Sequence, residues 1–170
     1  MKKILTLLAL AAALLLTLAA CGGSDQSPQE DAAIPVVKGD TLGSDLANRF
    51  LPLAVTDESA TAATLAEAVV ADLPFEAMVM PVEPGLLTGF GNAEVTGFTE
   101  GVMFGPAIST IPFLGYVFQL EEGADGEVFC QTLQDNADLR WNICTEAEEM
   151  VAVQGGDYVF FLMCPTSLEG

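Results

Sequence analysis

The stretch Tyr158-Val159-Phe160-Phe161-Leu162-Met163 decides the fold of this chain. Every residue in it is apolar or aromatic, a composition that favours a β-strand. Successive side chains of a strand point to opposite faces of the sheet, so both faces of this strand are apolar. We therefore expect a central strand that is covered on both sides, closed by Pro165.

The neighbouring segments supply the rest of a sheet. Residues 148–153 and 157–164 are joined at Gln154-Gly155-Gly156, which is a hairpin signal. Residues 75–82, 94–99 and 114–120 are also predicted strands, and Pro81 places the end of the first at an edge or a bulge. Residues 101–113 are interrupted by glycine and proline, so we expect them to fold over the core without forming a regular strand.

Helical periodicity is clearest in two places. Residues 57–73 carry an apolar stripe, with Thr56 as the expected N-cap and Pro74 at the end. Residues 126–139 follow Asp125, which is expected to cap them. Residues 41–55 are ambiguous, because their apolar spacing is nearly helical but Pro52 is expected to stop a helix.

These elements predict an α+β fold: a mostly antiparallel sheet of about five strands with two main helices packed on one face. The other face of the sheet then needs a cover. Residues 101–113, a second copy of the chain or a partner could supply it.

The N-terminus has the pattern of an export signal. Lys2 and Lys3 precede the apolar run 4–16, and small residues lead to Leu18-Ala19-Ala20-Cys21. That ending resembles the lipobox of bacterial lipoproteins. The resemblance implies cleavage between Ala20 and Cys21 and acyl chains such as palmitate on Cys21. A transmembrane helix is the alternative, but about 13 apolar residues fall short of the ~20 that span a bilayer.

We therefore predict three parts of the chain: a signal peptide (1–20), a flexible acidic tether (21–40) and a single α+β domain (41–170). The mature protein is expected on the extracytoplasmic face of the cell membrane, held there through the lipid on Cys21.

Charge and composition exclude several classes of function. The chain carries 24 acidic residues, no histidine and a net charge of −19. Removal of the signal would leave only Lys38, Arg49 and Arg140 as basic residues. Such a surface repels nucleic acid, so no nucleic-acid partner is expected. The absence of histidine excludes the usual Ser-His-Asp and Cys-His catalysis and His-based metal sites.

Three cysteines remain once Cys21 is assigned to lipid: Cys130, Cys144 and Cys164. Outside the membrane one pair among them could form a disulfide, and the spacing does not say which pair. Three buried reduced thiols are the alternative. The spacings contain no C-x-x-C motif, so they do not point to a metal or redox site.

Arg140-Trp141 is the candidate binding site, because arginine and tryptophan are typical of binding hot spots. The alternative is that Trp141 anchors the end of the second helix. Met78, Met80 and Met103 could form an adaptable apolar surface, although core packing is the commoner role. Residues 121–127 are acidic but lack the ligand pattern of an EF-hand, so we predict no metal and no cofactor.

The last 90 residues or so resemble an uncharacterised family of bacterial lipoproteins. This family has a C-terminal domain of unknown function and is typical of anaerobic Gram-positive bacteria. The resemblance rests on patterns in residues 80–87 (MPVEPGLL), 104–106 (FGP), 111–118 (IPFLGYVF) and 136–142 (NADLRWN). It implies an envelope lipoprotein and no known activity or catalytic residue.

The function expected from the sequence is therefore a lipid-anchored, non-enzymatic binding or interaction module. A protein partner or a homodimer would fit this role. The alternatives are an accessory subunit of an envelope complex and a cell-wall hydrolase that uses carboxylates.

Overall fold

The fold is seen in a computed structural model that describes residues 34–108 and 110–168. The helices and strands, in chain order, are α1 (Leu42–Thr56), α2 (Ala62–Val70), β1 (Ala77–Pro81), β2 (Gly85–Leu86), β3 (Glu94–Val95), β4 (Phe98–Pro106), β5 (Leu114–Leu120), α3 (Gly126–Asn136), β6 (Glu149–Gly155) and β7 (Tyr158–Cys164).

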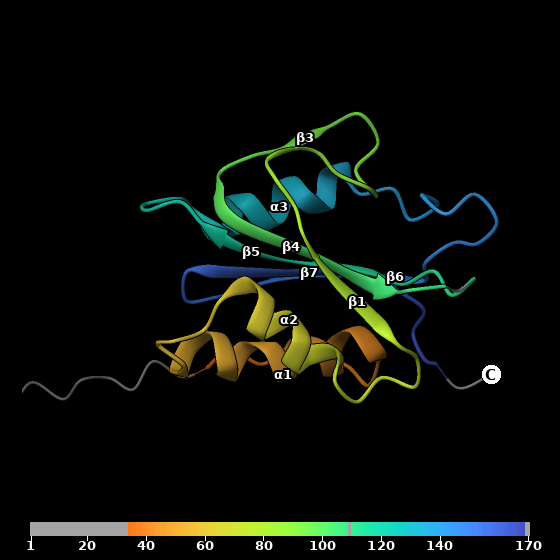
Figure 1. The fold of residues 1–170 in the computed structure, drawn as a ribbon, viewed down its shortest axis with the longest axis horizontal. Helices are drawn as coiled ribbons and strands as arrows, with labels where there is room; N and C mark the ends of the chain where they lie inside the picture. The colour runs from red at the N-terminus through yellow and green to blue at the C-terminus, as the bar shows by residue number, and fades with distance from the viewer. Residues whose placement is uncertain (1–33, 109, 169–170) are drawn as a thin grey trace, which may run out of the picture. The chain divides into compact units, whose positions relative to one another are not determined.

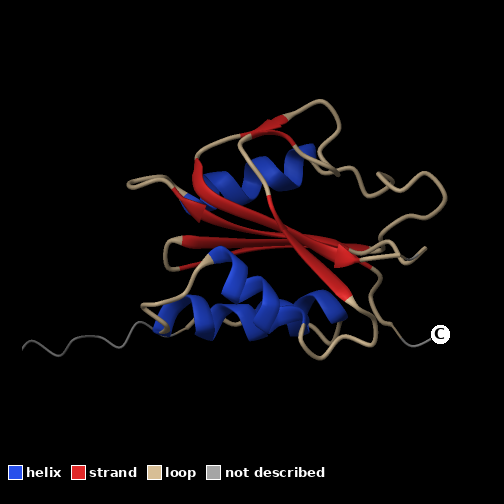
Figure 2. Ribbon diagram, in the orientation of Figure 1, coloured by secondary structure: helices blue, strands red, loops and turns tan. Residues whose placement is uncertain are grey.

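One antiparallel sheet organises the chain, with strand order β1-β4-β5-β7-β6, while β2 and β3 form a separate small ribbon. Helices α1 and α2 cover one face of the sheet, and α3 lies on the other (Figures 1 and 2). The antiparallel α+β fold is thus confirmed. The pair of helices that shares a face is α1 and α2, and the predicted helix at 126–139 lies opposite them.

Strand β7 behaves as its sequence predicts. It pairs with β5 on one side and β6 on the other, and all its residues are buried. Phe160 and Leu162 pack into the core under α1 and α2, whereas Phe161 and Met163 pack into the core on the α3 side. The two-sided apolar stretch therefore separates two cores, although β5 is the middle strand of the sheet.

The ambiguous segment 41–55 is a helix that continues past Pro52. Thr41 and Ser44 form a capping box at its start, and Phe50 stacks on Phe160 of β7 with ring centroids 5.3 Å apart. An interior proline costs a helix about 3 kcal/mol, which such burial can offset. The expectation that Pro52 stops the helix was wrong.

The second helix starts later than predicted. Thr56 ends α1, and the N-cap of α2 is Thr61, which forms a capping box with Thr64. Between them, Asp57 accepts hydrogen bonds from the backbone N–H (2.9 Å) and the hydroxyl (2.6 Å) of Ser59. Asp57 and Ser59 were predicted to lie in the first turn of the helix, but they form this turn before it.

Residues 101–106 belong to β4, so the prediction of an irregular segment there was wrong. The glycines of this strand allow close packing rather than breaking it. A Cβ on Gly101 would lie 2.7 Å from the ring of Phe98, and one on Gly105 would lie 3.0 Å from the carbonyl oxygen of Phe113. A glycine inside a strand commonly marks such a close approach. As predicted, Pro81 ends an edge strand.

Part of the predicted tether is described, and its last residues contact the domain. The side chain of Asn48 in α1 accepts a hydrogen bond from the backbone N–H of Val37 (2.9 Å) and donates one to its carbonyl (2.9 Å). Ile34 and Val37 also pack against the core. The predicted signal segment, including Ala20, and the predicted lipid site Cys21 lie outside the described residues.

Candidate functional site

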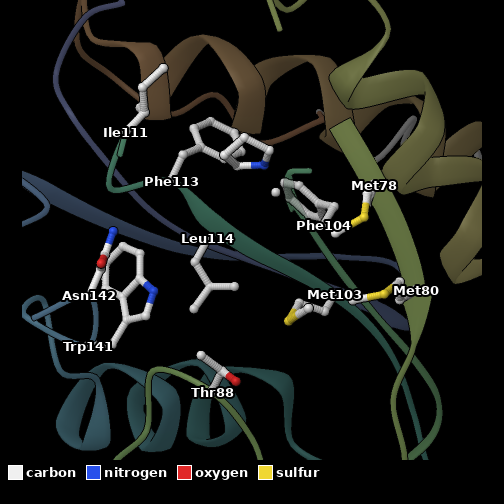
Figure 3. Close-up of a pocket in the computed structure, with 12 residues that line it drawn as sticks. Met78, Met80, Thr88, Met103, Phe104, Ile111, Phe113, Leu114, Trp141 and Asn142 are labelled. Atoms are coloured by element: carbon white, nitrogen blue, oxygen red, sulfur yellow. The ribbon is translucent and has the colours of Figure 1, made fainter. Parts of the chain in front are cut away.

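A groove opens on the α3 side of the sheet, next to the edge strand β1. Its volume is about 220 Å³. Figure 3 shows three methionines on one side of it and the loop after α3 on the other. Its lining consists of Met78, Met80, Thr88, Met103, Phe104, Gly105, Pro106, Ile111, Phe113, Leu114, Trp141 and Asn142.

The methionines come together because of the register of β1 and β4. Met80 pairs with Met103, and Met78 pairs with Gly105. Side chains alternate along β1, so Ala77 and Val79 pack into the core under α2 while Met78 and Met80 face the other way. Met78 is 40% exposed and Met80 is 38% exposed. They form a flexible, polarizable apolar surface that solvent reaches.

The loop around Thr88 forms the floor of the groove, and a buried tyrosine holds this loop in place. The hydroxyl of Tyr116 in β5 donates a hydrogen bond of 2.8 Å to the carbonyl oxygen of Thr88. Burial raises the pKa of Tyr116 above its usual value, so the phenol stays neutral and can donate at physiological pH. Beside Thr88, Gly89 has φ +89°, and a Cβ there would lie 2.6 Å from Cε of Met163. The loop therefore lies directly on the sheet.

The loop after α3 is attached to the same floor. The backbone N–H of Asp138 donates to the carbonyl oxygen of Gly89 (2.8 Å), and the N–H of Trp141 donates to that of Asp138 (3.0 Å). These bonds place the indole of Trp141 at the side of the groove. It is the only tryptophan of the chain.

The remaining wall is the connection from β4 to β5. Phe113 packs edge-on against Phe75, with centroids 5.2 Å apart, and tilted against Phe104 at 6.1 Å. Several exposed apolar side chains lie on the segments that form the groove. Ile108 is 98% exposed, Ile143 is 93% exposed and Leu86 is 66% exposed. An apolar hollow with an apolar surround is typical of a binding surface.

The predicted pair Arg140-Trp141 is divided between two roles. Trp141 lines the groove, but Arg140 is not among the lining residues. Arg140 instead lies near Glu146, with Nε 3.7 Å from the carboxylate oxygen, and both side chains are more than half exposed. Such a surface pair contributes little stability. Core packing was the commoner role expected for the methionines, but Met78 and Met80 are partly exposed in the groove. Their alternation along an edge strand that ends at a proline could have indicated this.

The three described cysteines are free, so no disulfide joins them in this structure. Cys130 lies on α3, and Cys164 lies in the core on the opposite face of the sheet, so these two cannot pair across the folded sheet. Burial raises the pKa of Cys130 to about 11, and it also raises that of Cys164. Cys144 is exposed.

A second hollow lies where the end of α1 meets the β6–β7 turn, and it carries carboxylates. Asp57, Glu58 and Asp157 line it together with Tyr158. Tyr158 donates a 2.6 Å hydrogen bond to the carbonyl oxygen of Ala60. The hydrogen bonds from Ser59 lower the pKa of Asp57. A lowered pKa does not suit the general acid of glycoside cleavage, but it is compatible with the ionised carboxylate that acts as nucleophile or base.

The acidic side chains that drew attention in the sequence have structural roles. Asp125 caps α3, accepting from the N–H groups of Glu127 (3.0 Å) and Val128 (3.1 Å). Glu148 accepts two hydrogen bonds from Thr166. Within residues 34–108 and 110–168, no cluster of histidine, cysteine and acidic residues is arranged to hold a metal ion. In the same ranges, no helix has the length and hydrophobicity needed to cross a membrane.

Comparison with known proteins gives no match to a protein-family model, to a curated protein or to a solved structure.

Proposed function

We propose that this protein is a lipid-anchored binding module on the extracytoplasmic face of the cell membrane, and that the groove beside β1 is its binding site. The observation that carries the binding role is the lining of the groove. It combines exposed methionines, aromatic rings and one tryptophan, and none of its residues is charged. Apolar and aromatic linings with few polar groups are typical of binding sites.

The same lining supports binding rather than catalysis. Thr88 carries its only hydroxyl and Asn142 its only side-chain amide, and neither has a base beside it in the lining. The alternative of a carboxylate-based hydrolase has less support, because the lining of the groove contains no carboxylate. The accessory-subunit alternative gains support from the exposed apolar residues around the groove, which favour a protein partner.

The anchor rests on the sequence. Replacing Cys21 with serine removes the thiol that the lipid would modify. We expect this variant to leave the membrane fraction and to lose incorporation of a palmitate analogue in growing cells. The matched control is Cys144→Ser, which keeps the lipobox. Unchanged incorporation of the palmitate analogue into Cys21→Ser would show that Cys21 does not carry the lipid.

The binding role is tested by site-specific photo-crosslinking in the native host. A benzophenone amino acid is placed at residue 80 in the groove or at residue 53 on α1. Met80 and Leu53 are 38% and 37% exposed, so the two positions differ in location rather than in accessibility. We expect a discrete adduct, detected by mass spectrometry, at residue 80 only. Equal labelling at both positions, or none at residue 80, would contradict the proposal.

A further inference from the structure

Within the described residues, strand β1 has no neighbouring strand on one edge, and the hydrogen-bond pattern shows which groups it presents there. The N–H of Val82 donates to the carbonyl oxygen of Gly101 (2.8 Å), and the N–H of Ala107 donates to that of Glu76 (3.1 Å). In an antiparallel ladder the direction of these groups alternates. The backbone N–H and C=O groups of Met78 and Met80 therefore bond to β4. Those of Ala77 and Val79 point away from β4.

We infer that this edge binds an extended segment of a partner protein, with apolar side chains at alternate positions and basic residues at both ends, as a sixth strand of the sheet. The inference rests on the proposed binding role of the groove and names its ligand. A residue opposite Val79 would exchange two backbone hydrogen bonds with it. The residues opposite Met78 and Met80 would point to the groove side and extend the row of methionines.

The outward backbone groups of β1 can pair fully with such a strand at Ala77 and Val79, and only in part at Pro81. Pro81 is the next outward residue after Val79, and it lacks an N–H but still offers its carbonyl oxygen. The other edge strand, β6, contrasts with β1 because α1 and α3 pack on its two faces. On the α3 side, β1 borders the groove, whereas α3 itself packs against β6 and β7.

The charges around the edge select a basic partner. Glu76 and Glu83 are exposed and flank β1 at its two ends, whereas the groove between them is uncharged. A second copy of the chain, paired antiparallel about Val79, would bring Glu76 of one copy beside Glu83 of the other. Like charges opposite each other destabilise a strand pair, and each copy also carries a net charge of −19.

The size of the groove agrees with a peptide ligand. Pockets for small molecules commonly enclose about 300–1,000 Å³. This groove has about 220 Å³, and exposed apolar residues such as Ile108 and Ile143 lie on the segments that line it. It can take a few side chains of a longer ligand whose backbone is bound by β1.

The test uses the purified full chain in phosphatidylcholine vesicles and three capped peptides. The first, KTITITK, places isoleucines opposite Met78 and Met80 and lysines near the two glutamates. The second, ETITITE, reverses the charges. The third is KTITITK with an N-methyl group on its central residue, which removes the donor facing Val79. Trp141 emission reports binding, because this tryptophan lies in the groove.

We expect KTITITK to bind, with both other peptides weaker by about tenfold or more. Bound KTITITK should slow hydrogen–deuterium exchange of the Val79 amide and leave that of Met80, which already bonds to β4, unchanged. Equal binding of the N-methylated peptide, or no protection of Val79, would overturn the inference. Protection of Val79 that grows with the concentration of the chain alone would also overturn it, in favour of a homodimer.

Failure here is distinguishable from failure of the proposed function. A photo-adduct at residue 80 in cells, together with no peptide pairing at β1, would keep the groove as a binding site and reject the added strand. Absence of that adduct would reject the binding role itself.

Discussion

Replacing Gly89 with alanine tests how the floor of the groove is held. Gly89 has φ +89°, a region that costs an L-residue about 1–2 kcal/mol. The new Cβ would also lie 2.6 Å from Met163 and 2.9 Å from Leu114, in both cases from the end of a flexible side chain. Overpacking of this kind costs about 1–3 kcal/mol. Once the lower entropy of the unfolded chain is counted, we expect a loss of about 2–4 kcal/mol of folding free energy.

Gly91 provides the matched control two residues away. Its φ is +58°, but nothing lies within 4 Å of the Cβ that alanine would add. Gly91→Ala therefore carries the backbone strain without the overpacking, and we expect it to cost about 1 kcal/mol once the lower entropy of the unfolded chain is counted. The difference between the two variants isolates the packing of Gly89 on the sheet.

The assay is urea unfolding of the purified chain followed by circular dichroism, together with Trp141 emission in the native state. Because the carbonyl oxygen of Gly89 accepts from Asp138, displacement of this loop should shift the emission of Trp141 in Gly89→Ala but not in Gly91→Ala. Equal destabilisation by both substitutions would refute the close approach to Met163. An unchanged Trp141 spectrum in Gly89→Ala would refute the coupling between the two loops.

Three further outcomes are expected. Met80→Glu should weaken binding of KTITITK by about tenfold or more, whereas Leu53→Glu, at an equally exposed site, should leave its affinity unchanged. Iodoacetamide at pH 8 should label Cys144 in the native chain but label Cys130 only after unfolding, since Cys130 is partly buried with a pKa of about 11. Hydrogen bonds in the folded state lower the pKa of Glu148 below 4.5, so its stabilising contribution is present above that pH and is lost as the pH falls through the folded-state pKa. Glu148→Gln should accordingly flatten the fall in stability on acidification, measured by urea unfolding at a series of pH values.

Local sequence patterns predicted the strands well where one signal dominated. The apolar run of β7 required cover on both faces, and the alternation in β5 placed Tyr116 and Phe118 on one face; the structure has both. Proline was also informative at Pro81, because an edge strand tolerates a missing donor there. In these elements the periodicity and the backbone chemistry favour the same structure, so the local sequence was enough to predict them.

The failures occurred where a local penalty met a larger packing gain. Pro52 and the glycines of β4 weaken a helix and a strand taken alone, but burial of Phe50 against Phe160 and of the Phe98 ring over Gly101 favours the regular elements. The N-cap of α2 was predicted at Thr56 but is Thr61, because α1 extends through Thr56. Such gains depend on partners far away in the chain, which no local window contains.

The sequence by itself determined the antiparallel α+β fold, through strand periodicity and turn residues that act over a few positions. It also supplied the pattern on which the anchor at Cys21 is proposed. Only the tertiary structure decided which helices share a face and that Met78, Met80 and Trp141 meet in one groove. Their meeting depends on the register of β1 with β4 and on backbone hydrogen bonds between two loops. These are long-range pairings, and the order of residues along the chain does not specify them locally.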